Sequence, residues 1–534
     1  MPYLSSLLLD RFRTFGRETN FDFAPVTIIT GPNSSGKSSI LKSLLLLRES
    51  ARQKRFQQVF GATALLEALA FGDDVHGLRS FQNAYSSYAP DTDGEKTMHI
   101  SLGVEDALGH YLVCKFDRDI PAGEPLVLEY NLAKYRKEFV WPSPVVFDLV
   151  YSERELKEIK IYDASTKPRK YICSVSEEIL KRPVGPHGIP NLKVGVDSEL
   201  NGPWFLEQLG STPEELAETL GVDVSNDLYV LFERLSEKVR DWQPDVGFQG
   251  VEAAFMMAPA ALLSAEDVAT NDYVRRFAAY TATVLIRQAV SSLLSALSSL
   301  SYQTRISVSS DGLVNDTGEL ATTELEYIAG SGSTKSIRYW LDTFEIAQDV
   351  KVQKVAENGF LVQLKRDGHW VGLEHVGEGH KRLLAFILHS SHNRSRQRTP
   401  LLVEEPEANL HPNLQSRLAD LFLEIARESE IDSTGWYGED EQQEESPYYT
   451  PNHQLIVETH SEYLVRRLQY LVATGKASPE DVVIYYLGAD PTADDYVKRI
   501  TIAPSGKLSE SFGPGFTDES TNLMIDLYKQ THQN

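Results

Sequence analysis

The hydrophobic pattern contains three short apolar runs, each followed by polar residues and then by a stretch with helical spacing. The first run, Thr27 to Thr30, precedes a loop of small residues and a leucine-rich stretch that extends to Leu47. The second, Leu401 to Val403, precedes apolar residues that recur every three or four positions, namely Leu414, Leu418, Leu421, Phe422 and Ile425. The third, Leu455 to Val457, precedes another helical pattern. Short apolar runs bounded by turns are typical of buried strands. Each run therefore predicts a strand, a turn and a helix in that order.

The loop after the first run has the spacing of a phosphate-binding loop. Gly31 to Ser38, "GPNSSGKS", fits G-x-x-x-x-G-K-[ST], and it lies between a predicted strand and a predicted helix, as the motif requires. Its glycines let backbone N–H groups face phosphates, Lys37 adds a positive charge, and the Ser38 hydroxyl can bind Mg²⁺. A turn without a ligand is the alternative. We predict that ATP and Mg²⁺ bind here, with contacts from Gly31, Asn33, Ser34, Gly36, Lys37, Ser38 and Ser39.

Acidic residues end the second run, where a buried strand would not tolerate them. Glu404 and Glu405 follow Leu401 to Val403 directly. At the carboxyl end of a strand facing a phosphate-binding loop, the first acid can hold Mg²⁺ through water and the second can polarise the attacking water. Two solvated glutamates at a surface are the alternative. Glu458, Thr459 and His460 end the third run, and His460 is either a capped polar residue or a contact to the γ-phosphate. We predict Glu404 as a metal-site residue, and Glu405 and His460 as catalytic residues.

The composition is typical of an ordinary soluble protein. The chain has 534 residues with 42% hydrophobic content and a net charge of −24, and it contains no run of 18 or more apolar residues. Without such a run we expect no membrane span. Two cysteines are too few for a disulfide framework, so we expect a protein of the reducing cytoplasm. The negative charge argues against attraction of the whole surface to nucleic acid. Two basic segments, 48–55 and 392–398, leave nucleic acid as a candidate partner, although solvated faces are the alternative.

The long middle of the chain must contain structure of its own. Alternating runs such as "HISLGV" and "YLVCKF" predict antiparallel strands, and segments between 212 and 301 have helical spacing. No sustained heptad pattern predicts a long coiled coil. We expect an α/β fold with four parts: an N-terminal half of the ATPase core (1–96), an antiparallel β part (97–205), a compact helical insertion (206–301) and a C-terminal half (302–534). The last includes an acidic loop at 428–453, interpreted as a solvated loop or as a docking arm for a basic partner.

The motifs together resemble the ABC-type ATPase heads of the SMC, RecF and OLD group. They are most similar to bacterial AAA ATPases of antiphage defence operons, such as the ATPase subunits of PARIS, Septu and retron-associated systems. The resemblance is carried, in chain order, by "LDRFRTFG", "TIITGPNSSGKSSIL", "FGDDV", "VGEGHKRLLAFI", "LLVEEPEANLHP", "IVETHSEYLVRRL" and "GPGFTDES". It implies an ABC-type P-loop ATPase head with an antiparallel β subdomain. It matches Lys37 and Ser38 to the phosphate and Mg²⁺ contacts, Glu404 and Glu405 to the paired acids, and His460 to the switch histidine. Arg13, in the first motif, is included as a nucleotide contact.

The resemblance also implies a signature motif that reaches the ATP of a second head. It would start at Val376-Gly377-Glu378-Gly379-His380, so Gly377, Gly379 and Lys381 are candidate contacts. Lys381 and Arg382 stand where this group commonly has serine and glutamine, and a positive residue could replace the usual hydroxyl contact electrostatically. A polar helix start is the alternative interpretation. Gln57, Gln58 and Asp74 are the candidates for the Q-loop residue.

The resemblance implies ATP hydrolysis coupled to assembly. We expect a head-to-head dimer or a higher homo-oligomer that acts as sensor or scaffold for a separate effector, a nuclease or a toxin, responding to a phage-derived trigger. The stretch after His460 is too short for the Toprim domain of OLD nucleases, so no nuclease activity is expected from this chain alone. A RecF-like, DNA-stimulated repair ATPase and a nucleotide-locked scaffold with little turnover are the alternatives.

Overall fold

A computed structural model describes the chain in segments. The described residues are 4–52, 69–90, 94–105, 110–114, 136–140, 144–153, 156–165, 167–176, 293, 296–302, 313–315, 322–333, 335–356, 359–390, 399–426, 453–513, 516 and 519–532. The predicted helical insertion lies almost entirely outside these residues. So do the acidic loop up to residue 452, the basic segment 392–398, and the Q-loop candidates Gln57 and Gln58.

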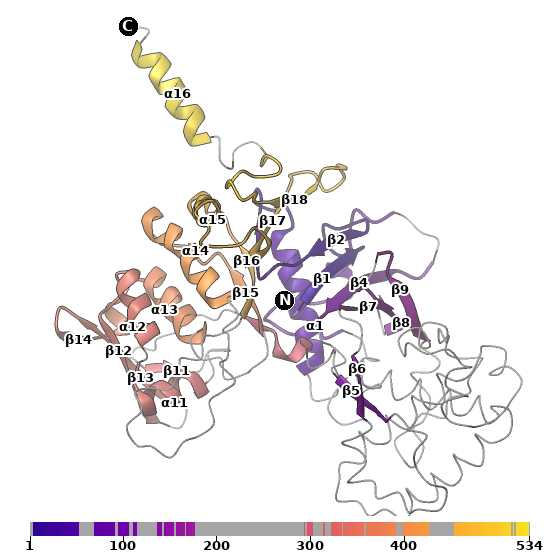
Figure 1. The fold of residues 1–534 in the computed structure, drawn as a ribbon, viewed down its shortest axis with the longest axis horizontal. Coiled ribbons are helices and arrows are strands. Elements are labelled where there is room, and N and C mark those ends of the chain that lie inside the picture. The colour runs from indigo at the N-terminus through magenta and orange to yellow at the C-terminus, as the bar shows by residue number, and fades with distance from the viewer. Residues whose placement is uncertain are drawn as a thin grey trace, which may run out of the picture.

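A six-stranded sheet forms the centre of the molecule (Figure 1). Its order is β10 (Ser301–Tyr302), β15 (Thr399–Glu404), β16 (His453–Glu458), β3 (Val26–Thr30), β17 (Val482–Leu487) and β18 (Val497–Thr501). The first five strands are parallel, and β18 runs antiparallel to β17. Every residue of β3, β16 and β17 is buried, as expected for parallel strands that are covered on both faces. The three sequence runs thus became neighbouring strands, with β16 between β15 and β3.

Helices cover the two faces of this sheet. α1 (Lys37–Arg52) packs on the face that presents Ile29, Leu402 and Ile456. α14 (Pro412–Ala426) and α15 (Glu462–Ala473) pack on the opposite face, which presents the adjacent residues Ile28, Val403 and Val457. Alternate side chains of a strand point to opposite faces, so the apolar residues of each strand contribute to both cores. The predicted helices after the three runs are confirmed.

A second six-stranded sheet is antiparallel and shares the core of α1. Its order is β2 (Thr19–Asp22), β1 (Leu4–Asp10), β4 (Thr97–Val104), β7 (Val145–Ser152), β8 (Leu156–Asp163) and β9 (Lys170–Ser176). Nearby elements are α2 (Phe81–Ala84) and the pair β5 (His110–Cys114) and β6 (Arg136–Val140). Because β1 pairs with β4, the proposed division between residues 96 and 97 runs through one sheet.

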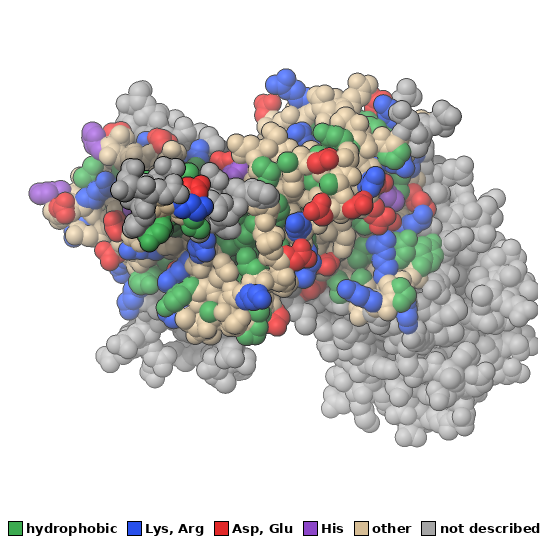
Figure 2. Space-filling view, turned by 90° about the horizontal axis from the view of Figure 1, so that it is seen from above, with side chains coloured by type: hydrophobic (Ala, Val, Ile, Leu, Met, Phe, Trp, Pro, Cys, Tyr) green, Lys and Arg blue, Asp and Glu red, His purple; other side chains and the backbone are tan. Residues whose placement is uncertain are grey.

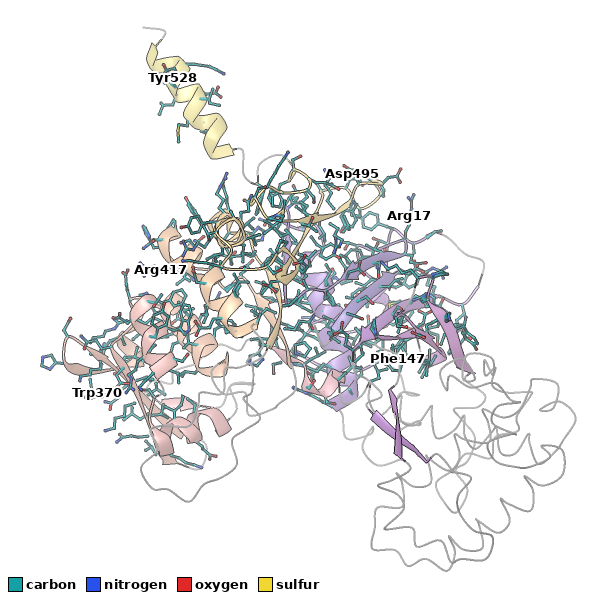
Figure 3. The ribbon with its side chains drawn as sticks, viewed as in Figure 1. Arg17, Phe147, Trp370, Arg417, Asp495 and Tyr528 are labelled. Carbon is teal, nitrogen blue, oxygen red and sulfur yellow. The ribbon has the colours of Figure 1, made fainter. Side chains whose placement is uncertain are left out.

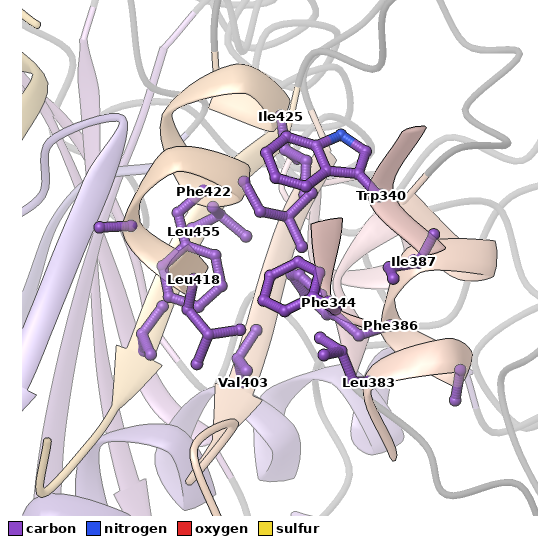
Figure 4. Close-up of a cluster of buried hydrophobic side chains, with 14 of the residues drawn as sticks. Trp340, Phe344, Leu383, Phe386, Ile387, Val403, Leu418, Phe422, Ile425 and Leu455 are labelled. Carbon is purple, nitrogen blue, oxygen red and sulfur yellow. The ribbon is translucent and has the colours of Figure 1, made fainter. Parts of the chain in front are cut away.

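A third, four-stranded sheet lies on the side of α14 and α15 (Figure 1). It contains β11 (Leu313–Asn315), β12 (Asp349–Ala356), β13 (Gly359–Arg366) and β14 (His369–Gly372), with α11 (Thr322–Ser331), α12 (Lys335–Thr343), η3 (Leu373–His375) and α13 (Glu378–Ser390). Figure 4 shows Trp340, Phe344 and Phe386 of this part beside Phe422 of α14. The rings of Phe386 and Phe422 are 5.6 Å apart in an edge-to-face arrangement. This apolar contact joins the third sheet and its helices to the central sheet.

The remaining elements are η4 (Pro479–Asp481) and α16 (Glu519–His532), which stands apart from the sheets in Figure 1. Figure 3 shows Phe147 within the antiparallel sheet, whereas Trp370 on β14 and Tyr528 on α16 lie at the periphery and are 42% and 62% exposed. The predicted α/β fold with an antiparallel β part is confirmed. No long coiled coil occurs within the described segments.

Candidate nucleotide-binding site

The loop between β3 and α1 has the backbone conformation of an anion-binding concavity. Gly31 and Gly36 have φ angles of 145° and 92°, and Ser34 has a φ of 65°. A Cβ atom on Gly31 would lie 2.3 Å from the carbonyl oxygen of Leu487, and one on Gly36 would lie 2.2 Å from the Thr14 hydroxyl oxygen. Only glycine fits these two positions, because both the dihedral angles and the space exclude a side chain. Ser34 and the neighbouring Asn33 are exposed on the loop.

Two side chains from distant parts of the sequence brace this loop. Tyr496, just before β18, donates its hydroxyl hydrogen to the carbonyl oxygen of Ser35. Arg13 donates from Nε to the Ser39 hydroxyl oxygen across 3.0 Å, at the first turn of α1. Burial lowers the pKa of the Arg13 guanidinium. The bond to Ser39 places Arg13 beside the phosphate-binding loop, where its positive charge would attract the phosphates of a bound nucleotide.

The Lys37 side chain is folded over the loop. Its ammonium group donates to the carbonyl oxygens of Gly31 at 3.2 Å and Pro32 at 2.8 Å. The residue is only 4% exposed. Burial lowers the pKa of Lys37, while the carboxylates of Glu458 and Glu405 act in the opposite direction. A buried cation next to carboxylates and a ring of backbone dipoles is suited to binding a phosphate.

The paired acids lie at the carboxyl end of β15. Glu404 faces Glu458 of β16 in register, and its Oε2 accepts a hydrogen bond from the Tyr302 hydroxyl at 2.8 Å. Glu405 has a φ of 43°, a left-handed conformation that few residues other than glycine adopt. Its backbone N–H donates to the Glu458 carbonyl oxygen at 2.8 Å. The strained backbone leaves the Glu405 side chain exposed at the edge of the sheet, where it can reach a ligand.

His460 lies between the exposed Glu405 and a buried acid, Glu407. The His460 backbone N–H donates to Glu407 Oε1 at 2.6 Å, and the His460 ring Nε2 lies 3.9 Å from Glu405 Oε1. Burial lowers the pKa of the imidazole, Lys37 lowers it further, and Glu405 opposes them. The ring is therefore mostly neutral at pH 7.

Glu458 is the site residue that sequence reasoning missed. The sequence contains it as the last residue of a strand, and we assigned it no role. In the structure its Oε1 accepts a hydrogen bond from the Ser38 hydroxyl at 2.9 Å, and the residue is 5% exposed. Burial raises its pKa to about 7, with contributions from Glu404 and Glu405 in the same direction and from Ser38 and Lys37 in the other. The sequence did offer a signal, because Glu458 follows its apolar run directly, just as Glu404 follows the run Leu401 to Val403.

The contacts recorded for the predicted signature residues lie within α13 and the loop after β15. Gly377 precedes α13, while Gly379 and Lys381 lie in its first turn, and Figure 1 shows α13 and α1 on opposite sides of β15 and β16. Lys381 Nζ pairs with Glu378 Oε1 of the same helix at 2.8 Å. Gly379 packs against the loop after β15, since a Cβ atom there would lie 2.5 Å from the Asn409 carbonyl oxygen.

The described part of the first basic segment contains one buried arginine, Arg48, and one exposed arginine, Arg52. Arg48 is 1% exposed and pairs with Glu49 across 2.5 Å. Arg52 donates to the carbonyl oxygens of Ser298 and Leu300. Arg48 is therefore neither part of a solvated face nor free to contact nucleic acid, whereas Arg52 is exposed and both interpretations stay open for it. Figure 2, which views the molecule from above relative to Figure 1, shows acidic and basic side chains interspersed over the described surface.

The residues of the site fit ATP with Mg²⁺. The loop, Lys37 and the N-terminus of α1 offer positive groups to phosphates, and Ser38 with Glu458 offers oxygen ligands of the kind Mg²⁺ prefers. One of these oxygens, Glu458 Oε2, is buried and has no hydrogen-bond partner. In the described segments no group of three or more His, Cys, Asp or Glu side chains could hold a metal ion by itself. A cation here would therefore depend on the phosphates of a nucleotide.

Two segments of the chain match family models. Residues 6–53, which include the phosphate-binding loop, match a model described as an AAA domain. Residues 284–465, which include the acids of β15 and β16, match a model described as an AAA ATPase domain. These matches agree with the prediction of an ATP-binding ATPase, and both parts of the site fall within them. No curated protein matches the chain. In the described part of the chain, no helix is both long and apolar enough to cross a membrane.

Solved structures of SMC head domains show a weak similarity to the chain. A head bound to the C-winged helix domain of ScpA is 13% identical with a TM-score of 0.37, covering 94% of this chain and 98% of that chain. A Pyrococcus furiosus head with an extended coiled coil, bound to the C-terminal domain of ScpA, is 13% identical with a TM-score of 0.36, covering 99% and 100%. The head domain from Thermotoga maritima is 11% identical with a TM-score of 0.31, covering 94% and 100%.

Proposed function

We propose that the chain is an ABC-type ATPase that works by ATP-dependent association of heads. One observation carries the proposal: Lys37 and Ser38 of the phosphate-binding loop face carboxylates at the ends of two adjacent parallel strands, β15 and β16. A basic loop that faces acids across a short gap is the arrangement needed to hold a nucleotide triphosphate, a cation and a water molecule together. The matches to AAA ATPase models support the same reading.

Each side chain has a separate role in this proposal. Lys37 would bind the phosphates, and Ser38 and Glu404 would hold Mg²⁺, Glu404 through water. Glu405 orients the attacking water, because its carboxylate is exposed beside His460 at the open edge of the sheet. His460, with a mostly neutral ring, contacts the γ-phosphate as a hydrogen-bond partner. When bound, Mg²⁺ would neutralise charge that develops on the phosphates.

The assembly follows from the position of α13. Figure 1 shows α13 and α1 on opposite sides of β15 and β16, which favours a contact between the start of α13 and the ATP of a second head. We propose a head-to-head dimer, or a higher homo-oligomer, in which the start of α13 completes the partner's site.

The biological role we propose is that of a cytoplasmic sensor or scaffold in antiphage defence. The chain would control a separate effector, a nuclease or a toxin, in response to a phage-derived trigger. Support comes from the order and content of the sequence motifs. The competing role of a DNA-stimulated repair ATPase has less support, because Arg48 of the first basic segment is buried and pairs with Glu49.

Substitution of Glu405 tests the ATPase proposal. Purified protein should hydrolyse ATP in the presence of Mg²⁺, and Glu405→Gln should reduce turnover by about 10²-fold or more while leaving ATP binding intact, since an amide keeps the size but cannot act as a base. Phosphate release and calorimetric titration measure the two quantities.

Lys37→Ala is the companion variant. It should weaken ATP binding itself, because it removes the buried charge from the loop. Glu462→Gln serves as a control, since Glu462 pairs with Arg466 on α15. Undiminished turnover in Glu405→Gln would remove that residue from its role, and unchanged ATP affinity in Lys37→Ala would count against the loop as a phosphate site. Tight ATP binding without turnover in the wild-type protein would favour the nucleotide-locked scaffold.

A further inference from the structure

A buried carboxylate lies against the phosphate-binding loop where no role has been assigned. Glu458 ends β16, the strand between the P-loop strand β3 and the strand of the paired acids, β15. It faces Ile29 of β3 in register, one residue before that strand ends at Thr30. Glu404 lies one strand further from the loop and receives the Tyr302 hydroxyl hydrogen. Of the three acids, Glu458 is thus the one with a direct hydrogen bond to Ser38.

One of the two carboxylate oxygens of Glu458 has no hydrogen-bond partner among the described residues. Oε1 accepts from Ser38, but Oε2 is buried and accepts no hydrogen bond from the described residues. A buried polar atom without a partner costs about 1–3 kcal/mol, and more when the group is charged. Glu404 and Glu405 are close enough to Glu458 to repel its charge, and a single ammonium, that of Lys37, opposes them. Three carboxylates and one ammonium leave a local excess of negative charge that a divalent cation would neutralise.

The spacing of the oxygens also suits Mg²⁺. The Ser38 Oγ and Glu458 Oε1 atoms are 2.9 Å apart. Adjacent ligands of an octahedral Mg²⁺ ion, each about 2.1 Å from the metal, are separated by about 3.0 Å. The two oxygens can therefore occupy neighbouring positions around one ion with little movement. In that state the Ser38 proton would no longer be donated to Glu458.

We propose that Glu458 is a direct ligand of Mg²⁺, next to Ser38, when the nucleotide is bound. The inference rests on the proposed ATPase function and adds a protein carboxylate to its metal site. Two protein oxygens would bind the ion, and phosphate oxygens and water would supply the remaining ligands, which is how Mg²⁺ is usually held beside nucleotides. Glu404 then acts at a greater distance, through water and the Tyr302 hydroxyl.

Metal binding by the full-length protein tests this role. Mn²⁺ serves as the probe, because its free and bound forms are distinguished by electron paramagnetic resonance, and it is titrated with ATP present. We expect Glu458→Gln to raise the Kd for Mn²⁺ by at least about 10-fold, because replacing even the residues that support a metal ligand typically costs that much affinity. Glu458→Asp keeps the charge but draws the carboxylate back by one carbon, so it should also weaken Mn²⁺ binding. Glu404→Gln should weaken it less than either.

Controls separate this inference from the proposal on which it rests. In EDTA, Glu458→Gln should bind ATP at least as tightly as the wild type, because a negative charge near the phosphates has been removed. Glu462→Gln should leave both affinities unchanged. If the wild-type protein binds no ATP, the ATPase proposal fails and this inference falls with it. If the wild type binds ATP and Mn²⁺ but Glu458→Gln retains the wild-type Kd for Mn²⁺, or loses no more affinity than Glu404→Gln, the direct ligand role alone is overturned.

Discussion

Because Glu458 is buried, its titration should make a measurable contribution to the pH dependence of the protein's stability. Its pKa of about 7 in the folded protein lies above the value of 4.5 expected when the chain is unfolded. The folded state therefore binds a proton more tightly than the unfolded state does. The stabilising contribution is complete below pH 4.5 and is lost as the pH rises through 7.

We therefore expect the metal-free protein, in EDTA, to lose stability relative to Glu458→Gln between pH 5 and 7.5. The amide does not titrate, so the difference in unfolding free energy should change by an amount on the order of a few kcal/mol. Thermal unfolding of both proteins across this range measures it. Glu407, whose pKa burial also raises, is present in both proteins and cancels in the difference. Stability curves that stay parallel from pH 5 to 7.5 would show that Glu458 is already ionised throughout.

At the scale of elements, the start of α13 offers two glycines with different surroundings. A Cβ atom on Gly377 would meet nothing within 4 Å, whereas one on Gly379 would collide with the Asn409 carbonyl oxygen of its own chain. A bulky residue at position 379 would therefore disturb the monomer whether or not the helix meets a second head. Position 377 can accept a side chain in the monomer, which makes it the cleaner probe of an interface.

If α13 completes a partner's site, Gly377→Glu should abolish ATP hydrolysis while each monomer still binds nucleotide. The introduced carboxylate would face the γ-phosphate across the interface, and like charges repel. Gly377→Ala is the matched control and should retain most activity. Mixing Gly377→Glu with the double variant Lys37→Ala, Glu405→Gln should restore part of the activity, because the second chain contributes an intact α13. Phosphate release measures all three; wild-type turnover by Gly377→Glu alone would contradict a shared site.

The sequence predicted the elements of the site better than their contacts. The three apolar runs located β3, β15 and β16, because hydrophobic periodicity and turn residues are local signals, although each strand begins one or two residues before its run. The bond between Ser38 and Glu458 joins residues 420 positions apart and depends on β16 lying between its neighbours, which is a property of strand order. Arg48 was misjudged for a similar reason. A charged residue suggests exposure, but α1 is covered by a sheet on each side, and Glu49 compensates the buried guanidinium.

At the scale of the whole molecule, the energy of ATP would be used to shift a population. In the proposed assembly, ATP would favour associated heads and hydrolysis would allow them to separate, so any trigger would have to bind the two states with different affinities in order to change what the scaffold holds. Moving such an equilibrium from 1:99 to 99:1 requires about 5.5 kcal/mol of differential binding. A macromolecular trigger supplies that more readily than a small ion, since it contacts surfaces on both heads.

If the toxic activity belongs to a separate effector protein, the ATPase should be harmless by itself. Expressed alone, the chain should neither cleave DNA nor slow growth; expressed with its neighbouring gene, it should cause toxicity only after phage infection. That toxicity should require Lys37 and Glu405, because nucleotide binding and turnover set the population of associated heads. Growth after infection, compared among wild type, Lys37→Ala, Glu405→Gln and the Glu462→Gln control, measures the effect. DNA cleavage by the purified wild-type chain that persists at the same level in Lys37→Ala and Glu405→Gln preparations would mark a contaminant. Cleavage that disappears in both variants would assign the nuclease to this chain and overturn the need for a separate effector.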